Sequence, residues 1–349
     1  MAGVRILVLN GGSSSFKCRL DEISSDPPSD PPKPLWEGEV EFDGKPVPEM
    51  LTPMLRSVPG KVDVVGHRIV HGGPKYRQST IVTDDVTQAI AAAAQTAPAH
   101  NQFELAAIET AGRIFETTQI AVFDAAFHAT LEPAAYIYPG PYEWFTHGIR
   151  RYGFHGISHQ YASRRAGEIL GRQDACLITC HLGNGASLAA VRDGKSVDTT
   201  MGFTPLEGLM MGTRTGSIDP GIIIYLLRHR GYTAEQLDRI LNRESGLLGI
   251  SGVSGDMRKI LDAIEQGNEH ARLAFEIYAH RLCREVGAML GSLGGLDAIV
   301  FTGGIGENCA PLRDIVTRRF EFLHPRILVV HAEEDWEIAR ECYRLMQHP

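Results

Sequence analysis

LVLNGGSSSFK (Leu7–Lys17), HLGNGAS (His181–Ser187) and FTGGIGEN (Phe301–Asn308) each place glycine and small polar residues after an apolar run. A glycine-rich turn at the end of a strand can aim several backbone N–H groups at one phosphate oxygen. A single turn of this kind is more often a tight hairpin or a helix entry that needs a positive φ. Three of them in one chain favour phosphate binding. The sequence has no GxxxxGK[ST] motif and no GxGxxG after a strand, so it disfavours a P-loop or a Rossmann site.

The residues around the first two turns repeat one pattern. Strands Ile6–Leu9 and Phe16–Leu20 flank the first turn, which predicts a β-hairpin. Strands Ala175–His181 and Leu188–Arg192 flank the second turn in the same way. This is a weak internal repeat, and it indicates two similar halves.

Strands and helices alternate along the rest of the chain, which predicts an α/β fold. Residues 24–34 hold five prolines and are expected to form a surface loop. Asp219 before Pro220, and Thr233 with Gln236, are helix-start signals. The further strands are expected at Leu35–Phe42, Val62–Val70, Gln119–Phe123, Leu296–Phe301 and Ile327–His331. The further helices are expected from Asp84 or Asp85 to about Gln95, at about Phe103–Phe115, Ser158–Leu170 and Asn268–Leu293, after Asn308, and at about Glu333–Met346.

Composition limits the class of protein. The chain has 349 residues, about two domains at roughly 100 to 200 residues each. The formal net charge is −8 and no Lys/Arg-rich run offsets it, so nucleic acid is not an expected partner. The longest apolar runs, such as Ile222–Leu227, are far shorter than the roughly 18 residues that span a bilayer. The six cysteines form no CxxC pair, and we expect a soluble, cytoplasmic protein with reduced thiols and no membrane partner.

Seven segments in order strongly resemble the acetate kinase family of the actin, hexokinase and Hsp70 superfold. They are the three above with VGHRIVHGG (Val65–Gly73), AVFDAAFH (Ala121–His128), RRYGFHGISH (Arg150–His159) and TPLEGLMMGTRTGSIDP (Thr204–Pro220). The resemblance implies duplicated ribonuclease-H-like (actin-like ATPase) domains, with mixed β-sheets flanked by helices and an active-site cleft between them. Domain I, for the acyl substrate and phosphate, is expected at residues 1–126 plus 334–349. Domain II, for the nucleotide, is expected at 127–333.

The implied reaction is a reversible, direct in-line transfer of the ATP γ-phosphoryl group to acetate, which gives acetyl phosphate and ADP. The cofactor is Mg²⁺, with Mn²⁺ as a possible substitute, and the small-molecule partners are the carboxylate and ATP. A carboxylic acid with a pKa near ~4 is already ionised at neutral pH, so it needs no strong general base. It needs cations that cancel the repulsion between two anions, and arginine suits that task.

The resemblance also assigns roles to residues of this sequence. The expected catalytic residues are Asp124, His155 and Arg214. Acyl-substrate residues are Arg68, Val70, Ala99, His100, Phe154 and Pro205. Nucleotide residues are Ser13, Ser15, Lys17, His181, Leu182, Gly183, Asn184, Gly185, Asp256, Met257, Arg258, Gly304, Ile305, Gly306, Glu307 and Asn308. The expected metal ligands are Asn10 and Glu333, with Glu334 left open as an alternative to Glu333.

The sequence departs from the family at several places, among them the His331–Glu334 run that stands where Thr-Asn-Glu-Glu is usual. The segments between Lys17 and Arg68 and between Asn308 and Glu333 are each roughly two dozen residues shorter than the family leads us to expect, and surface loops tolerate such losses. Ala99 stands where leucine is usual, which could make room for propionate. The alternative functions within the same superfold are a kinase preferring propionate or butyrate, a sugar kinase, or an actin-like nucleotide sensor with no acyl acceptor. A homodimer built on the second half is expected.

Overall fold

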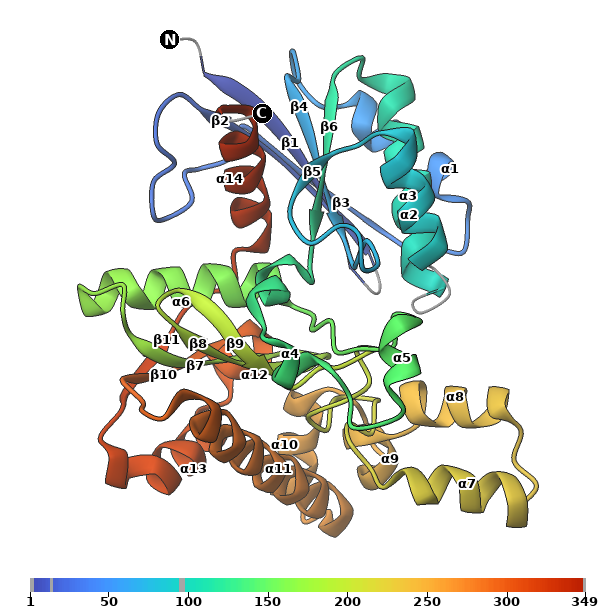
Figure 1. The fold of residues 1–349 in the computed structure, drawn as a ribbon, viewed down its shortest axis with the longest axis vertical. Coiled ribbons are helices and arrows are strands. Elements are labelled where there is room, and N and C mark those ends of the chain that lie inside the picture. Colours follow the sequence, from blue (N-terminus) through green and yellow to red (C-terminus); the bar gives the residue numbers. More distant parts are fainter. Residues whose placement is uncertain (1–2, 13–14, 94–97, 348–349) are drawn as a thin grey trace. The chain divides into compact units, whose positions relative to one another are not determined.

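The chain is divided into two units, each built on one mixed β-sheet (Figure 1). The structure, a computed structural model, describes residues 3–12, 15–93 and 98–347, and of residues 98–102 it describes the backbone alone. Unit 1 comprises Met1–Ala129, Gly156–Tyr161 and Glu333–Pro349. Unit 2 comprises Thr130–His155 and Ala162–Ala332.

The sheet of unit 1 has the strand order β3-β2-β1-β4-β6-β5. Strands β1, β2 and β3 are antiparallel neighbours, β1, β4 and β6 run parallel, and β5 is an antiparallel edge strand. The parallel strands bring their carboxyl ends to one edge, which is where open α/β sheets bind ligands. The strands are β1 (Val4–Gly11), β2 (Ser15–Ile23), β3 (Trp36–Glu41), β4 (Val64–Ile69), β5 (Thr80–Ile81) and β6 (Thr118–Phe123).

Helices cover both faces of this sheet (Figure 1). Side chains alternate along a strand, so Leu7 and Leu9 of β1 pack toward α1 and α3 on one face. Helix α14 packs on the other face. It approaches β4 so closely that a Cβ on Gly66 would lie 2.5 Å from the Cys342 sulfur. The helices are α1 (Val47–Arg56), α2 (Asp84–Ala93), α3 (Pro98–Ile114) and α14 (Glu334–Gln347).

The sheet of unit 2 repeats the plan of unit 1. Its order is β11-β10-β7-β8-β9, with β7, β8 and β9 antiparallel and β7, β10 and β11 parallel. When the edge strand β5 is left out and the strands of each sheet are numbered in chain order, both sheets have the order 3-2-1-4-5. The predicted repeat and the α/β class are therefore confirmed. The strands are β7 (Cys176–Leu182), β8 (Ala186–Arg192), β9 (Lys195–Thr199), β10 (Ala298–Thr302) and β11 (Arg326–Val329).

Helix α11 packs against β7, β8 and β9, and α13 packs on α11. Among the described residues, no helix is long and apolar enough to cross a lipid bilayer. The remaining helical segments are η1 (Ala126–Thr130), α4 (Pro133–Tyr136), α5 (Tyr142–Thr146), α6 (Gly156–Leu170), α7 (Pro220–His229), α8 (Ala234–Arg243), α9 (Gly246–Ser251), α10 (Met257–Glu265), α11 (Glu269–Leu293), α12 (Gly303–Asn308), α13 (Ala310–Phe320) and η2 (Glu321–Leu323).

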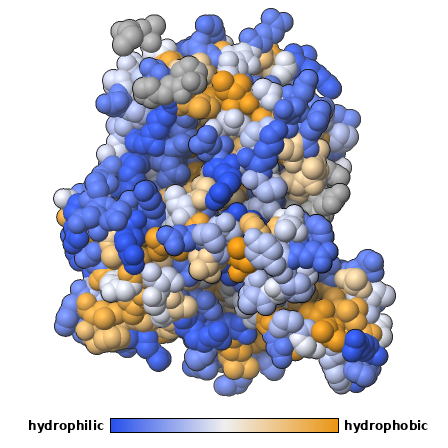
Figure 2. Space-filling view, viewed as in Figure 1, coloured by the Kyte–Doolittle hydropathy of each residue, from blue (hydrophilic) through white to orange (hydrophobic). Residues whose placement is uncertain are grey.

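Both predicted helix-start signals are confirmed. The Asp219 carboxylate accepts the Gly221 N–H at 2.8 Å at the start of α7, and Thr233 with Gln236 forms a full capping box at the start of α8. Helix α7 is unusual because its apolar side chains stay exposed. Figure 2 shows a hydrophobic area at the lower right, over α7 and α8. The exposed apolar side chains of α7 are Ile222, Ile224, Tyr225 and Leu227.

The sequence prediction was wrong or incomplete at several elements. It missed α1, because prolines at 46, 48 and 53 argue against a helix, yet Pro48 lies in the first turn, where proline is tolerated. For the same reason α3 begins at Pro98 and not near Phe103. Gly303–Asn308 is a helix directly after β10, whereas the first two glycine-rich turns are hairpins. The segments β5, β9, α4, α5, α9, α10, η1 and η2 were not predicted.

Candidate active site

Arg68 is the central cation of unit 1. Its Nη2 donates to Asp124 Oδ2 at 2.9 Å and its Nη1 donates to the Gly11 carbonyl at 3.0 Å. Asp124 is 1% exposed and follows β6, so the parallel strands β1, β4 and β6 deliver this pair to one sheet edge. Burial alone would lower the pKa of the Arg68 guanidinium, but the carboxylates of Asp124, Glu334 and Glu104 raise it above its usual value. The side chain is therefore a fixed positive charge held among acids.

Asn10 ends β1 at the same edge. Its Nδ2 donates to Asp335 Oδ1 at 2.6 Å, which leaves the amide oxygen as the atom with lone pairs for a cation. Burial raises the pKa of the Asp335 carboxyl to about 6, although the bond from Asn10 opposes the shift. Glu333 lies 3.9 Å from Arg19, whereas Glu334 acts electrostatically on Arg68.

These oxygen donors have the chemistry that Mg²⁺ prefers. Within residues 3–12, 15–93 and 98–347, no group of three or more His, Cys, Asp or Glu side chains is arranged to hold a metal by itself. Mg²⁺ is commonly held by one or two carboxylates together with substrate phosphates and water. The amide of Asn10 and the acids at the start of α14 fit that sparse pattern.

In the described part of unit 1, the other predicted substrate and nucleotide residues do not form one cluster with Arg68 and Asp124. Val70 is buried just after β4, and its N–H donates to the Glu104 carboxylate at 3.0 Å. Ser15 donates to Glu39 at 2.8 Å, and Lys17 is exposed opposite Asn10 in the hairpin. Ser13 lies outside the described residues. Ala99 and His100 lie in α3, but their side chains are also outside the description.

His155 is the best-anchored catalytic candidate of unit 2. Its backbone is left-handed, with φ of 57°, a conformation that a non-glycine residue adopts at a cost. Its Nδ1 lies 2.9 Å from Ser187 Oγ, and its ring stacks on His181 with 4.3 Å between centroids. This geometry leaves Nε2 directed at the turn: a Cβ on Gly185 would lie 3.1 Å from it.

Arg214 reaches the same glycine. A Cβ on Gly185 would lie 3.5 Å from Arg214 Nη1, so glycine here lets both side chains approach the backbone. That Nη1 also donates to the Pro205 carbonyl at 3.1 Å, and burial lowers the pKa of the guanidinium. Phe154 is buried beside His155 in the chain. Unit 2 therefore brings together His155, His181 and Arg214 around one glycine-rich turn.

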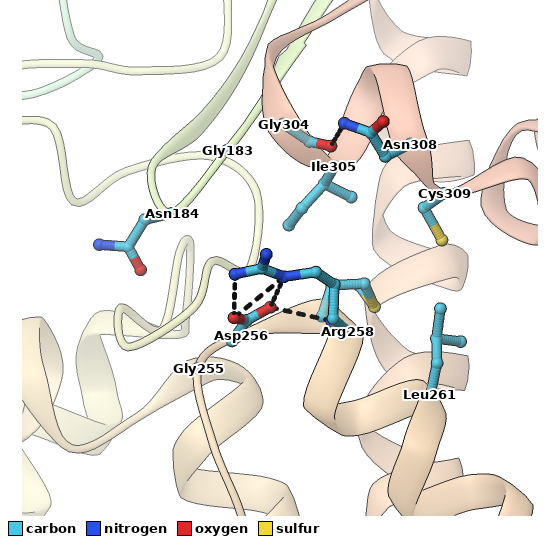
Figure 3. A pocket seen from close by; sticks show the side chains of 11 residues that line it. Gly183, Asn184, Gly255, Asp256, Arg258, Leu261, Gly304, Ile305, Asn308 and Cys309 are labelled. Atoms are coloured by element: carbon cyan, nitrogen blue, oxygen red, sulfur yellow. Dashed lines mark hydrogen bonds and ion pairs between the residues drawn. The ribbon is translucent and has the colours of Figure 1, made fainter.

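A pocket of about 760 Å³ lies beside this turn within unit 2 (Figure 3). Asp256 caps α10 through the Arg258 N–H at 2.9 Å and pairs with the Arg258 guanidinium at 2.6 Å. Asn308 donates to the Gly304 carbonyl at 2.9 Å. The predicted residues that line the pocket are Gly183, Asn184, Asp256, Met257, Arg258, Gly304, Ile305 and Asn308, and the unpredicted ones are Gly255, Leu261 and Cys309.

Five residues of unit 2 that were predicted for the nucleotide do not line this pocket: His181, Leu182, Gly185, Gly306 and Glu307. Leu182 is fully buried. The Glu307 carboxylate is occupied by the protein, because it accepts the N–H groups of Gly303 and Ala332 and lies 2.6 Å from His331 Nδ1.

Two sheets of one strand order, a pocket beside glycine-rich strand ends, and the largely enclosed arginines Arg68 and Arg214 define a kinase of the actin-like ATPase fold. The family model described as the acetokinase family matches residues 47–331. The chain belongs to the acetokinase family, and it is a kinase whose phosphoryl acceptor is a carboxylate.

Individual relatives match this chain over nearly its whole length. An acetate kinase from Cyanothece sp. is 48% identical over 405 positions, which cover 99% of this chain and 99% of that protein. The crystal structure of an acetate kinase from Porphyromonas gingivalis matches with a TM-score of 0.88 at 35% identity, covering 98% of this chain and 100% of that one. A propionate kinase from Francisella tularensis matches with a TM-score of 0.87 at 37% identity, covering 97% and 98%.

The chain is shorter than the relative it matches. Because it has 349 residues against 405 aligned positions, at least 56 positions of the Cyanothece alignment face gaps in this chain. That total agrees with two shortened segments of roughly two dozen residues each. In the structure, β2, β3 and α1 occupy the first segment, and α13 and β11 occupy the second.

Sequence reasoning missed Glu104, Asp335 and Cys309. The run Glu333-Glu334-Asp335 at a helix start is a usable signal, since acids gather in first turns. Glu104 gives no local signal, because a lone acid in a helix is usually solvated.

Proposed function

We propose that this protein is an acetate kinase that transfers the γ-phosphoryl group of ATP directly to acetate. A carboxylate oxygen bonds to the γ-phosphorus, the bond to the β,γ-bridging oxygen breaks, and acetyl phosphate and ADP leave. The observation that carries the proposal is the buried Arg68 guanidinium, fixed by Asp124 and the Gly11 carbonyl at the ends of parallel strands. Such a preorganised cation can bind a small carboxylate that is already ionised.

Each unit contributes a different part of the chemistry. Unit 1 supplies the residues that bind the acyl group. They are Arg68, which binds the carboxylate, and Val70, Ala99 and His100, which form the wall of the acyl pocket. Unit 2 supplies His155 and Arg214 to stabilise charge on the transferring phosphoryl group, Phe154 and Pro205 to contact the acid, and the pocket beside Gly183 and Asp256 to hold ATP or ADP. Because the transition state of phosphoryl transfer spreads charge over its oxygens, fixed donors are the main requirement.

We propose that Mg²⁺, or Mn²⁺ in its place, is held by Asn10 and by Glu334 in place of Glu333. Glu333 faces Arg19, whereas Glu334 acts on the Arg68 centre, which favours Glu334. When bound, the ion would neutralise charge on the nucleotide phosphates.

The acceptor is identified by trapping the acyl phosphate. Purified protein, ATP and Mg²⁺ are incubated with acetate, propionate, butyrate or glucose, quenched, and treated with hydroxylamine. Acetyl hydroxamate formation with the highest kcat/KM for acetate supports the proposal. A higher kcat/KM for propionate would support the alternative suggested by the propionate kinase neighbour. ATP hydrolysis without any hydroxamate would indicate a nucleotide sensor, and would overturn the proposal.

We also propose a homodimer formed through helix α7. Four large apolar side chains of α7 are 42–52% exposed, and no α7 residue is buried. A second copy of this chain offers the same apolar face, which suits a two-fold interface. Light scattering after size exclusion should give twice the chain mass. Ile224→Lys should give the single-chain mass, whereas Gln266→Lys, an exposed control, should not. A single-chain mass for the unmodified protein would contradict the dimer.

We further infer a cytoplasmic location. All six cysteines are unpaired, which fits a reducing compartment. Fractionation of source cells with an antibody to the protein would test this.

A further inference from the structure

Glu104 is an acid buried beside the acyl-binding arginine. It lies on α3, is 3% exposed, and accepts the Val70 N–H through Oε1 at 3.0 Å. Its other oxygen, Oε2, is buried and has no hydrogen-bond partner among the described residues. An oxygen left in this state costs free energy, more so when the group is charged. The site therefore favours a neutral carboxyl group that one backbone donor holds in place.

The charged groups around Glu104 come from two neighbouring strands. Arg68 on β4 and Asp124 after β6 both act on it electrostatically, and Glu334 of α14 acts in turn on Arg68. His71 is buried after β4, and burial lowers its pKa to about 4. The packed faces of α1 and α2 and the β1 face toward α3 are apolar, consisting of Val47, Met50, Leu51, Leu55, Val86, Ile90, Ala93, Leu7 and Leu9. Arg68 is thus the cation that an ionised Glu104 would meet.

The arginine also has an uncommitted donor. Nη1 and Nη2 of Arg68 are bonded, but its buried Nε has no hydrogen-bond partner in the part of the chain that the structure describes. A buried guanidinium with a spare N–H can donate to another carboxylate, and two carboxylates would compete for that N–H.

We propose that Glu104 is a positioning residue of the acyl site, which holds the Val70 wall in both of its forms and competes with the substrate carboxylate for Arg68 when it is ionised. This inference rests on the proposed function, because it requires that Arg68 bind the acyl group. Burial raises the pKa of Glu104 to about 8, with Arg68 and the Val70 N–H opposing the shift and Asp124 adding to it. The neutral form therefore prevails below about pH 8, and the competing form prevails above it.

The test is the pH dependence of the KM for acetate between pH 6.5 and 9.5, measured with saturating ATP and Mg²⁺. We expect this KM to rise about tenfold above pH 8 in the unmodified protein, while the KM for ATP changes little. In Glu104→Gln the rise should be absent, because glutamine keeps an oxygen for the Val70 N–H but carries no charge. Glu109→Gln, an exposed position on the same helix, is the matched control and should behave like the unmodified protein.

Two outcomes would overturn the inference: a flat acetate KM in the unmodified protein, or the same rise in Glu104→Gln. If Glu104→Gln does not fold, Glu104→Asp replaces it, and an unchanged midpoint of the rise then overturns the inference. A purely structural role would change thermal stability without moving this midpoint. Failure of the proposed function looks different, because the unmodified protein would then form no acyl hydroxamate at any pH.

Discussion

Both units contain a close arginine–aspartate pair at their site, and the two pairs differ in burial. Arg68 and Asp124 of unit 1 lie 2.9 Å apart with side chains 13% and 2% exposed. Arg258 and Asp256 of unit 2 lie 2.6 Å apart with side chains 86% and 32% exposed. Water screens the second pair and not the first, so distance alone does not measure their importance. Unit 1 fixes charge in advance, whereas the charged pair of unit 2 lies exposed at the lining of a pocket.

The largest effect is expected when the enclosed cation of unit 1, Arg68, is removed. Arg68→Ala should lower kcat/KM for the acid by a factor of at least about 100, or roughly 3 kcal/mol of transition-state stabilisation. It should also destabilise unit 1 by about 3 kcal/mol or more, because Asp124 loses a buried partner. Steady-state kinetics and urea unfolding check both effects. A folded variant with near-normal turnover would remove Arg68 from the site.

Substitutions of Arg214 and His155 should lower the activity of the enzyme without lowering its stability. In the described structure Arg214 bonds to a neutral carbonyl and not to a buried carboxylate, so Arg214→Ala should lose about 100-fold in turnover while its melting temperature changes little. His155→Ala should lower kcat with a modest change in the KM for ATP, since its role is in the transition state. An effect confined to ATP binding would assign His155 to the nucleotide.

The burial in unit 1 should also appear as acid sensitivity. Burial lowers the pKa of both His67 and His71 to about 4 from 6.5, although the Gln119 side chain opposes this for His67. Between pH 4 and pH 6.5 the unfolded chain therefore binds more protons at these histidines than the folded chain does. Stability is therefore full above pH 6.5 and is lost as the pH falls toward 4, by at most on the order of 3 kcal/mol for each histidine.

Urea unfolding at pH 5 and 7.5 measures this loss. His67→Gln should show a smaller difference between the two pH values than the unmodified protein, whereas His270→Gln, at an exposed position, should not. Equal pH dependence in all three proteins would contradict a role for His67.

The exposed pair of unit 2 should matter less. Arg258→Ala should raise the KM for ATP by a factor below about ten and leave the free energy of unfolding almost unchanged, because water screens this exposed guanidinium. Asp256→Ala should cost somewhat more stability, about 1 kcal/mol, because Asp256 also caps α10. If Arg258→Ala were as damaging as Arg68→Ala, the contrast between buried and exposed pairs would fail.

The smallest expected effect concerns the acyl pocket. Each buried methylene of a substrate contributes about 0.8 kcal/mol, so the alanine at position 99 could favour propionate over acetate by roughly fourfold relative to leucine. Ala99→Leu should lower the ratio of kcat/KM for propionate over acetate by about that factor. Phe103 is the neighbouring side chain that could fill the space instead, and an unchanged ratio would point to it.

Local rules predicted the parts of the molecule that depend on local sequence. The glycine-rich turns and the strands around them follow from apolar periodicity and from the freedom of glycine, and the caps of α7 and α8 follow from side-chain chemistry over four residues. Contacts between distant segments were not accessible in this way. Glu104 depends on the Val70 N–H, 34 residues away, and the assignment of Glu333 or Glu334 depends on where α14 begins.

Helix α14 has a consequence for how the chain folds during synthesis. It covers one face of the unit 1 sheet and buries Trp336 completely, yet it follows all of unit 2 in the sequence. The ribosome therefore delivers β1, β4 and β6 more than two hundred residues before the helix that shields them. During that interval Ile6 and Val8 present an apolar face without its cover, and unit 2 can complete its sheet first. At that point of synthesis the later half of the chain can be folded while the earlier half still lacks its last helix.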